Sequence, residues 1–274
     1  MNNPSSFQSS QTQQLTGATD FPVLITRPAG KADNLLAGLD ELGIGYTYQP
    51  LITTQLMPLR GRDIQHLQQA ELVIFVSVSA VTCLEQQFDL KSLTQPLLAV
   101  GATTASALER SCGHTVTAPL DQRSEGVLAL PQLQDVAGRD IVIVRGNGGR
   151  ELIKQGLLAR GAKVTYVQSY KRVPLPLDGQ RLSDQWRQQQ IQCIVVTSNE
   201  ILSLLLQSLP ETARPWLAQR QWIMVSQRMA ETAVASGIPM TNIFLAASAN
   251  DQALLEAICQ LRRKFHERAQ SNAE

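Results

Sequence analysis

The sequence has no apolar run near the roughly 20 residues that a membrane-spanning helix needs. It also lacks an excess of charge of either sign, because 24 Lys and Arg residues stand against 23 Asp and Glu residues, a formal net charge of +1 at pH 7. Binding to membranes or to nucleic acid that relies on bulk charge is therefore not expected. The 274 residues are 43% apolar, which is enough for one or two domains with full cores.

Paired cysteine motifs are absent as well. The four cysteines are far apart in the chain, no CxxC spacing occurs, and the three histidines stand in unrelated settings. Neither disulfide bonds nor a zinc site is predicted, so we expect a cytoplasmic protein without a metal site. The cysteines are Cys83, Cys112, Cys193 and Cys259.

The N-terminal 20 residues lack the basic and apolar regions of a secretory signal. Their Ser, Gln and Asn content cannot build a core, so residues 1–20 are predicted to be a disordered leader. The polar C-terminal sequence predicts a flexible tail over residues 263–274.

The chain contains an internal repeat. Residues 23–52 align without a gap with residues 141–170, and eight of the 30 positions are identical, against about two expected from average residue usage. Each copy shows the pattern of an apolar strand, a short turn, an amphipathic helix, a glycine and a second strand. The identical pairs are Ile25 and Ile143, Arg27 and Arg145, Gly30 and Gly148, Gly38 and Gly156, Leu39 and Leu157, Gly43 and Gly161, Thr47 and Thr165, and Tyr48 and Tyr166.

Further similar stretches follow each copy. Residues 72–81 resemble residues 192–201, and residues 97–116 resemble residues 222–241. This alternation of strands and helices predicts two α/β units, each with a parallel sheet covered by helices. Ligands of such sheets bind outside the carboxyl ends of the strands, where this sequence places hydroxyl groups, backbone amides and several arginines.

The turn after residues 141–145 partly matches the glycine fingerprint of a dinucleotide site. Gly146 and Gly148 match the first two glycines of the fingerprint, but Glu151 stands where the third is needed. A carboxylate at that position would repel a pyrophosphate, so nucleotide binding is not favoured. A large ligand with many negative charges fits the many donors better, although single Ser and Thr residues at these places are more often helix N-caps. A non-catalytic receptor for a small anion stays open as an alternative.

The ordered set of motifs resembles the uroporphyrinogen-III synthases. It comprises "LITRP", "FVSVSAV", "AVGATTASAL", "RSEGVLAL", "VRGNGGRELIKQGLLARGAKV", "YVQSYKRV" and "VVTSNEI". The resemblance implies a lyase of haem and sirohaem biosynthesis that cyclises hydroxymethylbilane, a linear tetrapyrrole with eight carboxylates, to uroporphyrinogen III. Water is lost and ring D is inverted through a spiro intermediate. The resemblance also implies a monomer without a cofactor.

The resemblance further implies how the chain is divided. It predicts two flavodoxin-like α/β domains, formed by the repeat, joined by a two-stranded β-ladder and separated by a cleft. Domain 1 would comprise residues 21–50 and 175–262, and domain 2 residues 58–165. The ladder would use residues 51–57 and 166–174.

Tyr170, on the second ladder strand, matches a tyrosine of the family and is the catalytic candidate; taken alone it would be a half-buried strand aromatic. The sequence departs from the family pattern at Ser79, Ser226 and Met229. Lys154, Lys171 and Arg172 are further cations that could meet substrate carboxylates. The substrate-binding candidates are Thr26, Arg27, Pro28, Ser77, Ser79, Gly101, Thr103, Thr104, Ser124, Arg145, Gly146, Asn147, Arg150, Thr197, Ser198, Asn199, Ser226 and Gln227.

Overall fold

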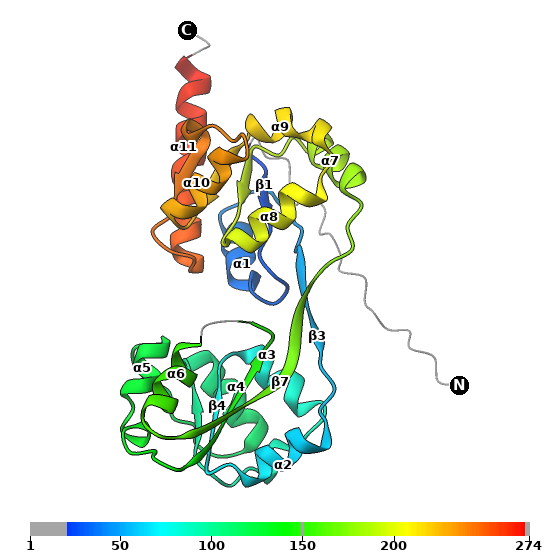
Figure 1. Cartoon of the computed structure of the whole chain (residues 1–274). Coiled ribbons are helices and arrows are strands. Elements are labelled where there is room, and N and C mark those ends of the chain that lie inside the picture. Colours follow the sequence, from blue (N-terminus) through cyan, green and yellow to red (C-terminus); the bar gives the residue numbers. More distant parts are fainter. Residues whose placement is uncertain (1–20, 149–150, 272–274) are drawn as a thin grey trace, which may run out of the picture. The chain divides into compact units, whose positions relative to one another are not determined.

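The computed structural model describes residues 21–148 and 151–271 of the chain (Figure 1). The described residues divide into two compact units. Unit 2 is the continuous segment Thr54–Val173, and unit 1 combines the residues up to Thr53 with those from Pro174 onward. The chain therefore passes from one unit to the other twice, and both units are α/β folds built on a five-stranded sheet.

The sheet of unit 1 has the strand order β10-β9-β8-β1-β2, and every pair in it is parallel. Counted along the chain within the unit, the order is 2-1-3-4-5, which is that of flavodoxin-like folds. The strands are β1 (Val23–Ile25), β2 (Tyr46–Tyr48), β8 (Cys193–Val195), β9 (Gln221–Met224) and β10 (Ile243–Leu245).

Helices cover both faces of this sheet. Val23 and Ile25 of β1 pack toward α1 and α11, while Leu24, between them, packs toward α7, α8, α9 and α10. This alternation follows from the two-residue period of a strand, and each fully buried Leu or Ile stabilises the fold by about 1.5–3 kcal/mol. The helices are α1 (Asp33–Glu41), α7 (Gly179–Gln188), α8 (Asn199–Ser208), α9 (Arg214–Ala218), α10 (Gln227–Ala235) and α11 (Asp251–Ser271).

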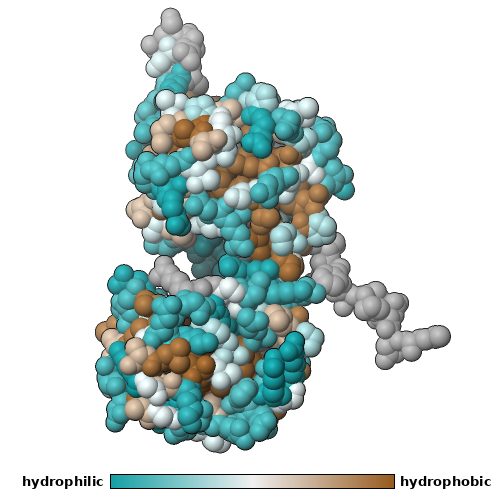
Figure 2. Space-filling view, in the orientation of Figure 1, coloured by the Kyte–Doolittle hydropathy of each residue, from teal (hydrophilic) through white to brown (hydrophobic). Residues whose placement is uncertain are grey.

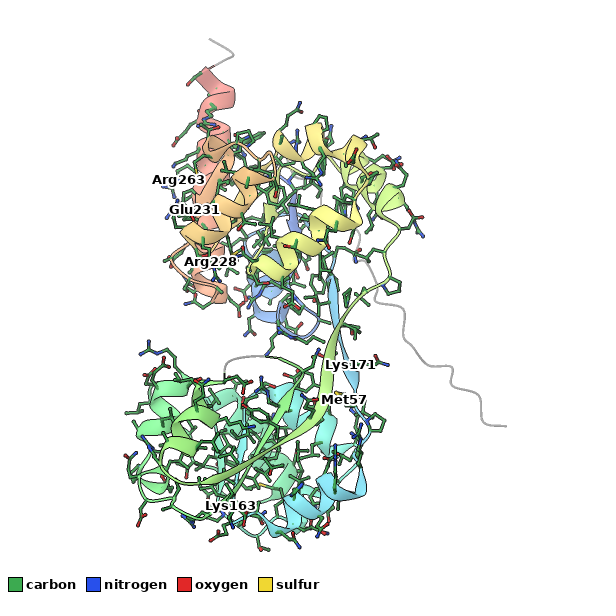
Figure 3. The ribbon with its side chains drawn as sticks, viewed as in Figure 1. Met57, Lys163, Lys171, Arg228, Glu231 and Arg263 are labelled. Atoms are coloured by element: carbon green, nitrogen blue, oxygen red, sulfur yellow. The ribbon has the colours of Figure 1, made fainter. Side chains whose placement is uncertain are left out.

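The sheet of unit 2 has the order β3-β7-β6-β4-β5. Its pairs are parallel from β7 to β5. The strands β3 and β7 run in opposite directions, because the Met57 amide donates to the Ser169 carbonyl and the Leu175 amide to the Leu51 carbonyl, both at 2.9 Å. Met57 and Lys171 mark these two strands in Figure 3. The strands are β3 (Ile52–Leu56), β4 (Leu72–Phe75), β5 (Leu97–Ala99), β6 (Asp140–Gly146) and β7 (Lys163–Pro174).

This sheet is also covered on both faces. Val142 and Val144 of β6 pack toward α2, α3 and α4, whereas Ile141 and Ile143 pack toward α5 and α6. The helices are α2 (Gly61–Gln69), α3 (Val78–Glu85), α4 (Ala102–Cys112), α5 (Ser124–Ala129) and α6 (Leu152–Ala159).

The internal repeat is confirmed in three dimensions. The strands β6 and β7 of unit 2 correspond to β1 and β2 of unit 1, and β4 and β5 correspond to β8 and β9, so both sheets share the order 2-1-3-4. A single parallel bridge between Leu98 and Thr117 stands where unit 1 has β10. The aligned glycines Gly43 and Gly161 end their helices with φ of 60° and 81°, a conformation that glycine adopts without strain.

The C-terminal segment differs from the expected flexible tail, because α11 continues to Ser271. Leu261 is buried against unit 1, and the ring of Phe265 lies 5.3 Å from that of Phe21, so apolar contacts extend the helix into the polar sequence. The predicted leader, residues 1–20, lies outside the described residues. No helix among residues 21–148 and 151–271 could span a membrane. On the face in Figure 2, hydrophilic residues are interspersed with apolar ones.

The interleaved units predict how fragments behave. Residues 136–274 retain β8, β9 and β10 of unit 1 and β6 and β7 of unit 2, so each sheet loses its remaining strands. We expect this fragment to show no cooperative thermal transition by circular dichroism. Residues 51–175 contain every strand of unit 2 and should unfold cooperatively as the matched control. A cooperative transition of 136–274 alone would contradict the interleaved arrangement.

Candidate active site

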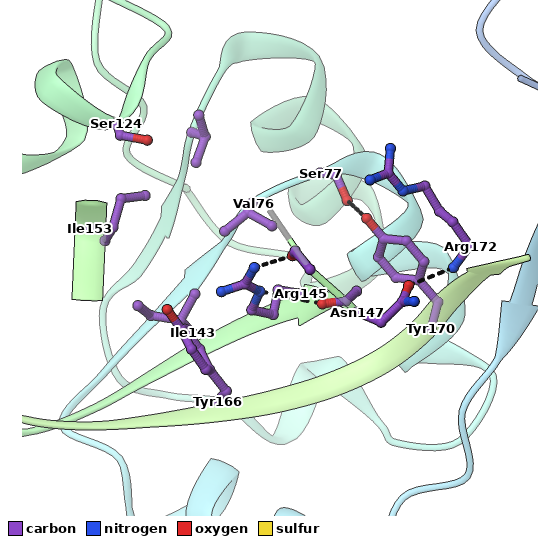
Figure 4. A pocket seen from close by; sticks show the side chains of 13 residues that line it. Val76, Ser77, Ser124, Ile143, Arg145, Asn147, Ile153, Tyr166, Tyr170 and Arg172 are labelled. Atoms are coloured by element: carbon purple, nitrogen blue, oxygen red, sulfur yellow. Dashed lines mark hydrogen bonds between the residues drawn. The ribbon is translucent and has the colours of Figure 1, made fainter. Parts of the chain in front are cut away.

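A pocket of about 280 Å³ opens at the carboxyl ends of β4, β5 and β6 in unit 2 (Figure 4). This edge is where ligands of parallel sheets bind. Its floor is apolar, and polar groups from β6, β7 and the starts of α3 and α5 surround it. The lining residues are Val76, Ser77, Val100, Ser124, Ile143, Arg145, Gly146, Asn147, Gly148, Ile153, Tyr166, Tyr170 and Arg172.

Several of the predicted residues meet here. Six of the candidates line the pocket: Ser77, Ser124, Arg145, Gly146, Asn147 and Tyr170. Four candidates of the same unit do not line it: Ser79, Gly101, Thr103 and Thr104. Arg150 lies outside the described residues. Tyr166 was not singled out as a site residue, although its alignment with Tyr48 was a signal that could have found it.

A register shift brings Tyr170 into the pocket. Along β6 and β7 the partners are Val144 with Val167 and Arg145 with Gln168, but Gly146 pairs with Tyr170, so Ser169 is the extra residue. Such an irregularity re-aims a side chain. Tyr170 consequently packs against the cluster that contains α3, whereas Tyr166 packs against the cluster that contains α6.

The ring of Tyr170 rests directly on Gly146. A Cβ atom built on Gly146 would lie 2.5 Å from Cε2 and 2.6 Å from Cζ of the ring, so any other residue would force the Tyr170 ring to move. The Tyr170 hydroxyl lies 3.0 Å from Oγ of Ser77. That serine is the N-cap of α3, and its Oγ accepts a hydrogen bond from the Ala80 amide at 3.1 Å.

Asn147 fixes the backbone beside Tyr170. Its amide donates to the Tyr170 carbonyl at 3.1 Å, and its side-chain oxygen accepts from the Arg172 amide at 2.7 Å. The turn after β6 is thereby tied to β7 at the Tyr170 carbonyl and at the Arg172 amide. Figure 4 shows the guanidinium of Arg172 beside the hydroxyls of Ser77 and Tyr170.

Arg145 is held by internal partners. Its side chain is only 6% exposed, and its guanidinium donates to the Gly146 and Gly148 carbonyls and to Glu151, the last at 2.8 Å. It also lies 4.4 Å from the centre of the Tyr166 ring, as Lys154 does at 4.5 Å. The donors of Arg145 therefore fix the glycine-rich turn, in which Gly148 has a φ of 75°.

Tyr166 and Glu151 complete this cluster. The Tyr166 hydroxyl donates to the second carboxylate oxygen of Glu151 at 2.7 Å. Burial and then this hydrogen bond raise the pKa of Tyr166 to about 12. Hydrogen bonds from Tyr166 and Arg145 lower the pKa of Glu151. Glu151 thus places a carboxylate of the protein at the turn where a dinucleotide fingerprint would receive a pyrophosphate.

The corresponding turns of unit 1 also make internal contacts. Thr26 is fully buried and donates to the Val195 carbonyl at 2.7 Å, Arg27 pairs with Asp251, and the Tyr48 hydroxyl donates to the Pro28 carbonyl at 3.2 Å. Substrate binding by this group stays a prediction. The unit 1 candidates are Thr26, Arg27, Pro28, Thr197, Ser198, Asn199, Ser226 and Gln227.

Two unit 1 candidates are helix caps. Oγ of Ser198 accepts from the Ile201 amide at 3.2 Å, and Oγ of Ser226 accepts from the Met229 amide at 3.3 Å. Such caps stabilise a helix by about 1 kcal/mol each. Within residues 21–148 and 151–271, no group of three or more His, Cys, Asp or Glu side chains could hold a metal ion.

The family model and the similar known proteins all point to the same enzyme family. Residues 33–256 match the family uroporphyrinogen-III synthase HemD. The uroporphyrinogen-III synthase of Escherichia coli is 35% identical over 245 residues, which cover 86% of this chain and 99% of that protein. The enzyme of Salmonella typhimurium is 35% identical over 246 residues, with the same coverage of both proteins.

Two solved structures share the fold. Uroporphyrinogen-III synthetase of Helicobacter pylori gives a TM-score of 0.58 at 17% identity, covering 88% of this chain and 99% of that one. A mutant uroporphyrinogen III synthase of Thermus thermophilus gives 0.56 at 19% identity, covering 89% and 99%. At 17% and 19% identity, the similarity to these two structures shows the fold alone. The family assignment rests on the family match over residues 33–256 and on the relatives that are 35% identical. The chain belongs to the uroporphyrinogen-III synthase family.

Proposed function

We propose that this protein cyclises hydroxymethylbilane to uroporphyrinogen III and that Tyr170 is the acid that assists departure of the ring A hydroxyl. The observation that carries the assignment of Tyr170 is its position in the pocket. The hydroxyl of Tyr170 lies at the carboxyl edge of the sheet, 3.0 Å from Ser77, and its ring is held against Gly146. The non-catalytic receptor is not favoured, because the chain belongs to a family of enzymes.

The pocket suits one ring of the substrate. Its volume of about 280 Å³ is just below the range of roughly 300–1,000 Å³ found for ligand pockets, so it can take one substituted pyrrole but not a tetrapyrrole. Val76, Ile143 and Ile153 offer an apolar floor for the ring. Arg172 and Ser124 also line the pocket and can meet the carboxylates of that ring.

The proposed reaction begins with proton transfer. Tyr170 gives its proton to the hydroxymethyl oxygen of ring A while the carbon–oxygen bond breaks, and the pyrrole electrons form the exocyclic double bond of an azafulvene cation. Water leaves. The substituted carbon of ring D attacks this electrophile and gives the spiro intermediate, which fragments and recloses with ring D inverted. The proton lost as the last pyrrole regains aromaticity restores Tyr170, so one water is the net by-product.

Two tyrosines line the pocket, and their surroundings distinguish them. Tyr166 already donates its proton to Glu151, and its pKa is raised to about 12, which makes it a weak acid. Tyr170 meets a serine hydroxyl instead, a group that can either donate or accept. The phenolic proton of Tyr170 can therefore point to a substrate, whereas that of Tyr166 is directed to a carboxylate.

We further propose that the protein acts as a monomer in the cytoplasm and binds no nucleic acid. The net charge of +1 supports the absence of nucleic-acid binding, because such binding depends strongly on positive charge. The four cysteines are free thiols, as is usual in a reducing compartment.

The function is tested with freshly made hydroxymethylbilane. We expect dialysed, chelator-treated protein that sediments as a single chain to produce uroporphyrinogen III, identified after oxidation by separating the uroporphyrin isomers. Spontaneous closure gives the uninverted isomer I, which serves as the baseline. Isomer I alone, or a rate restored only by added zinc or magnesium, would refute the proposal.

The role of Tyr170 is tested by Tyr170→Phe. Loss of one general acid typically costs about 10²–10⁴-fold in rate, and we expect a loss of about 10²-fold or less because the electron-rich pyrrole already activates the leaving group. The enzymatic product should still be isomer III, since positioning is retained. Rate and isomer ratio are scored separately after subtracting spontaneous closure. A rate equal to that of the wild type would reduce Tyr170 to a packing residue.

The contribution of the hydrogen bonds from Arg145 and Tyr166 to Glu151 is tested by Glu151→Gln. The pKa of Glu151 is lowered in the folded protein, so its carboxylate stabilises the fold above its unfolded pKa of about 4.3, and this contribution is lost as the pH falls through the folded pKa. We expect a lower Tm for the variant at pH 7 and a gap to wild type that closes on acidification below about pH 4. Asp135→Asn, at an exposed position of the same unit, is the control. A gap that persists unchanged in acid would show that the carboxylate charge is not responsible.

A further inference from the structure

Ser77 forms a hydrogen bond with the hydroxyl of Tyr170 and a second one with the Ala80 amide. Its Oγ lies 3.0 Å from the phenolic oxygen, and the geometry allows either atom to be the donor. The same Oγ accepts the Ala80 amide at 3.1 Å, which anchors the serine at the first turn of α3. The position of the serine oxygen is thus set by the backbone of unit 2 rather than by the tyrosine.

The hydrogen count at Ser77 restricts what its hydroxyl can do. A serine hydroxyl has one hydrogen and two acceptor sites, and one of these sites is occupied by the Ala80 amide. If Tyr170 donates to Ser77, the phenolic proton points away from the substrate. If Ser77 donates to Tyr170, the phenolic proton is left for the departing hydroxide, and the serine hydroxyl continues to donate to the phenolate that forms. Only the second arrangement serves an acid.

We propose that Ser77 is a positioning residue that donates its hydroxyl hydrogen to the phenolic oxygen of Tyr170. This inference rests on the proposed function of Tyr170 as the acid. Ser77 then contributes to the reaction in two ways. It directs the phenolic proton toward the leaving group, and it provides a charge-assisted hydrogen bond to the phenolate, which is stronger than a bond between neutral groups. Ser77 would therefore not be a ligand of a substrate carboxylate.

Capping alone does not explain this contact. Ser198 and Ser226 cap α8 and α10 with the same geometry, and in the described part of the chain neither hydrogen-bonds to a tyrosine. The bond to Tyr170 depends on the register shift at Gly146, which places the ring over that glycine and the hydroxyl beside α3. Capping and pairing are therefore separate roles of one oxygen atom.

The test is a double-mutant cycle between Ser77 and Tyr170. We expect Ser77→Ala to lower kcat about 10-fold, as loss of a hydrogen bond to a charged group implies, with KM changed by less than about twofold. In the Tyr170→Phe background the same substitution should cost less than about twofold, because the phenolic oxygen is gone. Ser77→Thr keeps both the hydroxyl and a good cap and should restore kcat to within about threefold of wild type.

Two further variants separate positioning from stability. Ser77→Gly removes the hydroxyl but is better tolerated at an N-cap than alanine, so it should repeat the loss of kcat if Ser77→Ala fails to fold. Asp178→Ala removes the N-cap of α7, where Oδ1 accepts the Arg181 amide at 3.0 Å. It should lower Tm with no change in kcat.

Three results would overturn the proposal: an unchanged kcat in Ser77→Gly, a loss that appears in KM instead of kcat, or an equal loss in the Tyr170→Phe background. Failure of the proposed function gives a different pattern. Wild-type protein would then form no isomer III, or Tyr170→Phe would keep the wild-type rate.

Discussion

The shift of one residue in the pairing of β6 with β7 determines where the two tyrosines of the pocket point. In a regular strand, Tyr166 and Tyr170 would point to the same face of the sheet, because side chains alternate with a period of two. The extra residue, Ser169, places Tyr170 on the face covered by α3, and its ring then occupies the space above Gly146. One strand therefore supplies two phenols in different surroundings: Tyr166 donates to a carboxylate, and Tyr170 meets a hydroxyl.

The two copies of the repeat share the internal contacts of their turns but differ at the position of the proposed acid. In each copy, the arginine that follows the first strand forms an ion pair within its own unit: Arg27 with Asp251, and Arg145 with Glu151. The aligned tyrosines also keep internal partners, and the pKa of Tyr48 is raised to about 12, chiefly by burial, as is that of Tyr166. Four positions further along the alignment, however, the first copy has Ile52 where the second has Tyr170. Both copies therefore keep the ion pair and the tyrosine hydrogen bond at their turns, and only the second copy has the tyrosine that we propose as the acid.

The residue pattern predicted two parallel α/β units, whereas the interleaved division of the chain was implied by the resemblance to the family. Apolar runs ending in hydroxyl residues and helices ending in Gly43 and Gly161 predicted the strand and helix order, because these signals act within a few residues of the chain. The roles of Arg27 and Arg145 could not be predicted from such local patterns. A cation after a strand is equally consistent with an anion site and with an internal ion pair, and only the folded turn brings Glu151 to Arg145. The register shift was equally hidden, since no residue type at Ser169 marks it.

Positioning of the reacting groups can contribute more to the rate of this reaction than a general acid can. A general acid supplies about 10²–10⁴-fold, whereas correct placement of reacting groups can supply effective molarities of about 10⁵–10⁸ M. The choice between isomers I and III is itself positional, because it depends on which carbon of ring D meets ring A. The described residues around Tyr170 are accordingly fixed by short contacts to backbone groups: Asn147 bonds to the Tyr170 carbonyl, Ser77 to the Ala80 amide, and Arg145 to the turn carbonyls. The proposed single acid, Tyr170, therefore needs to contribute only modestly, and a strongly activated nucleophile would add nothing to the selection of the carbon.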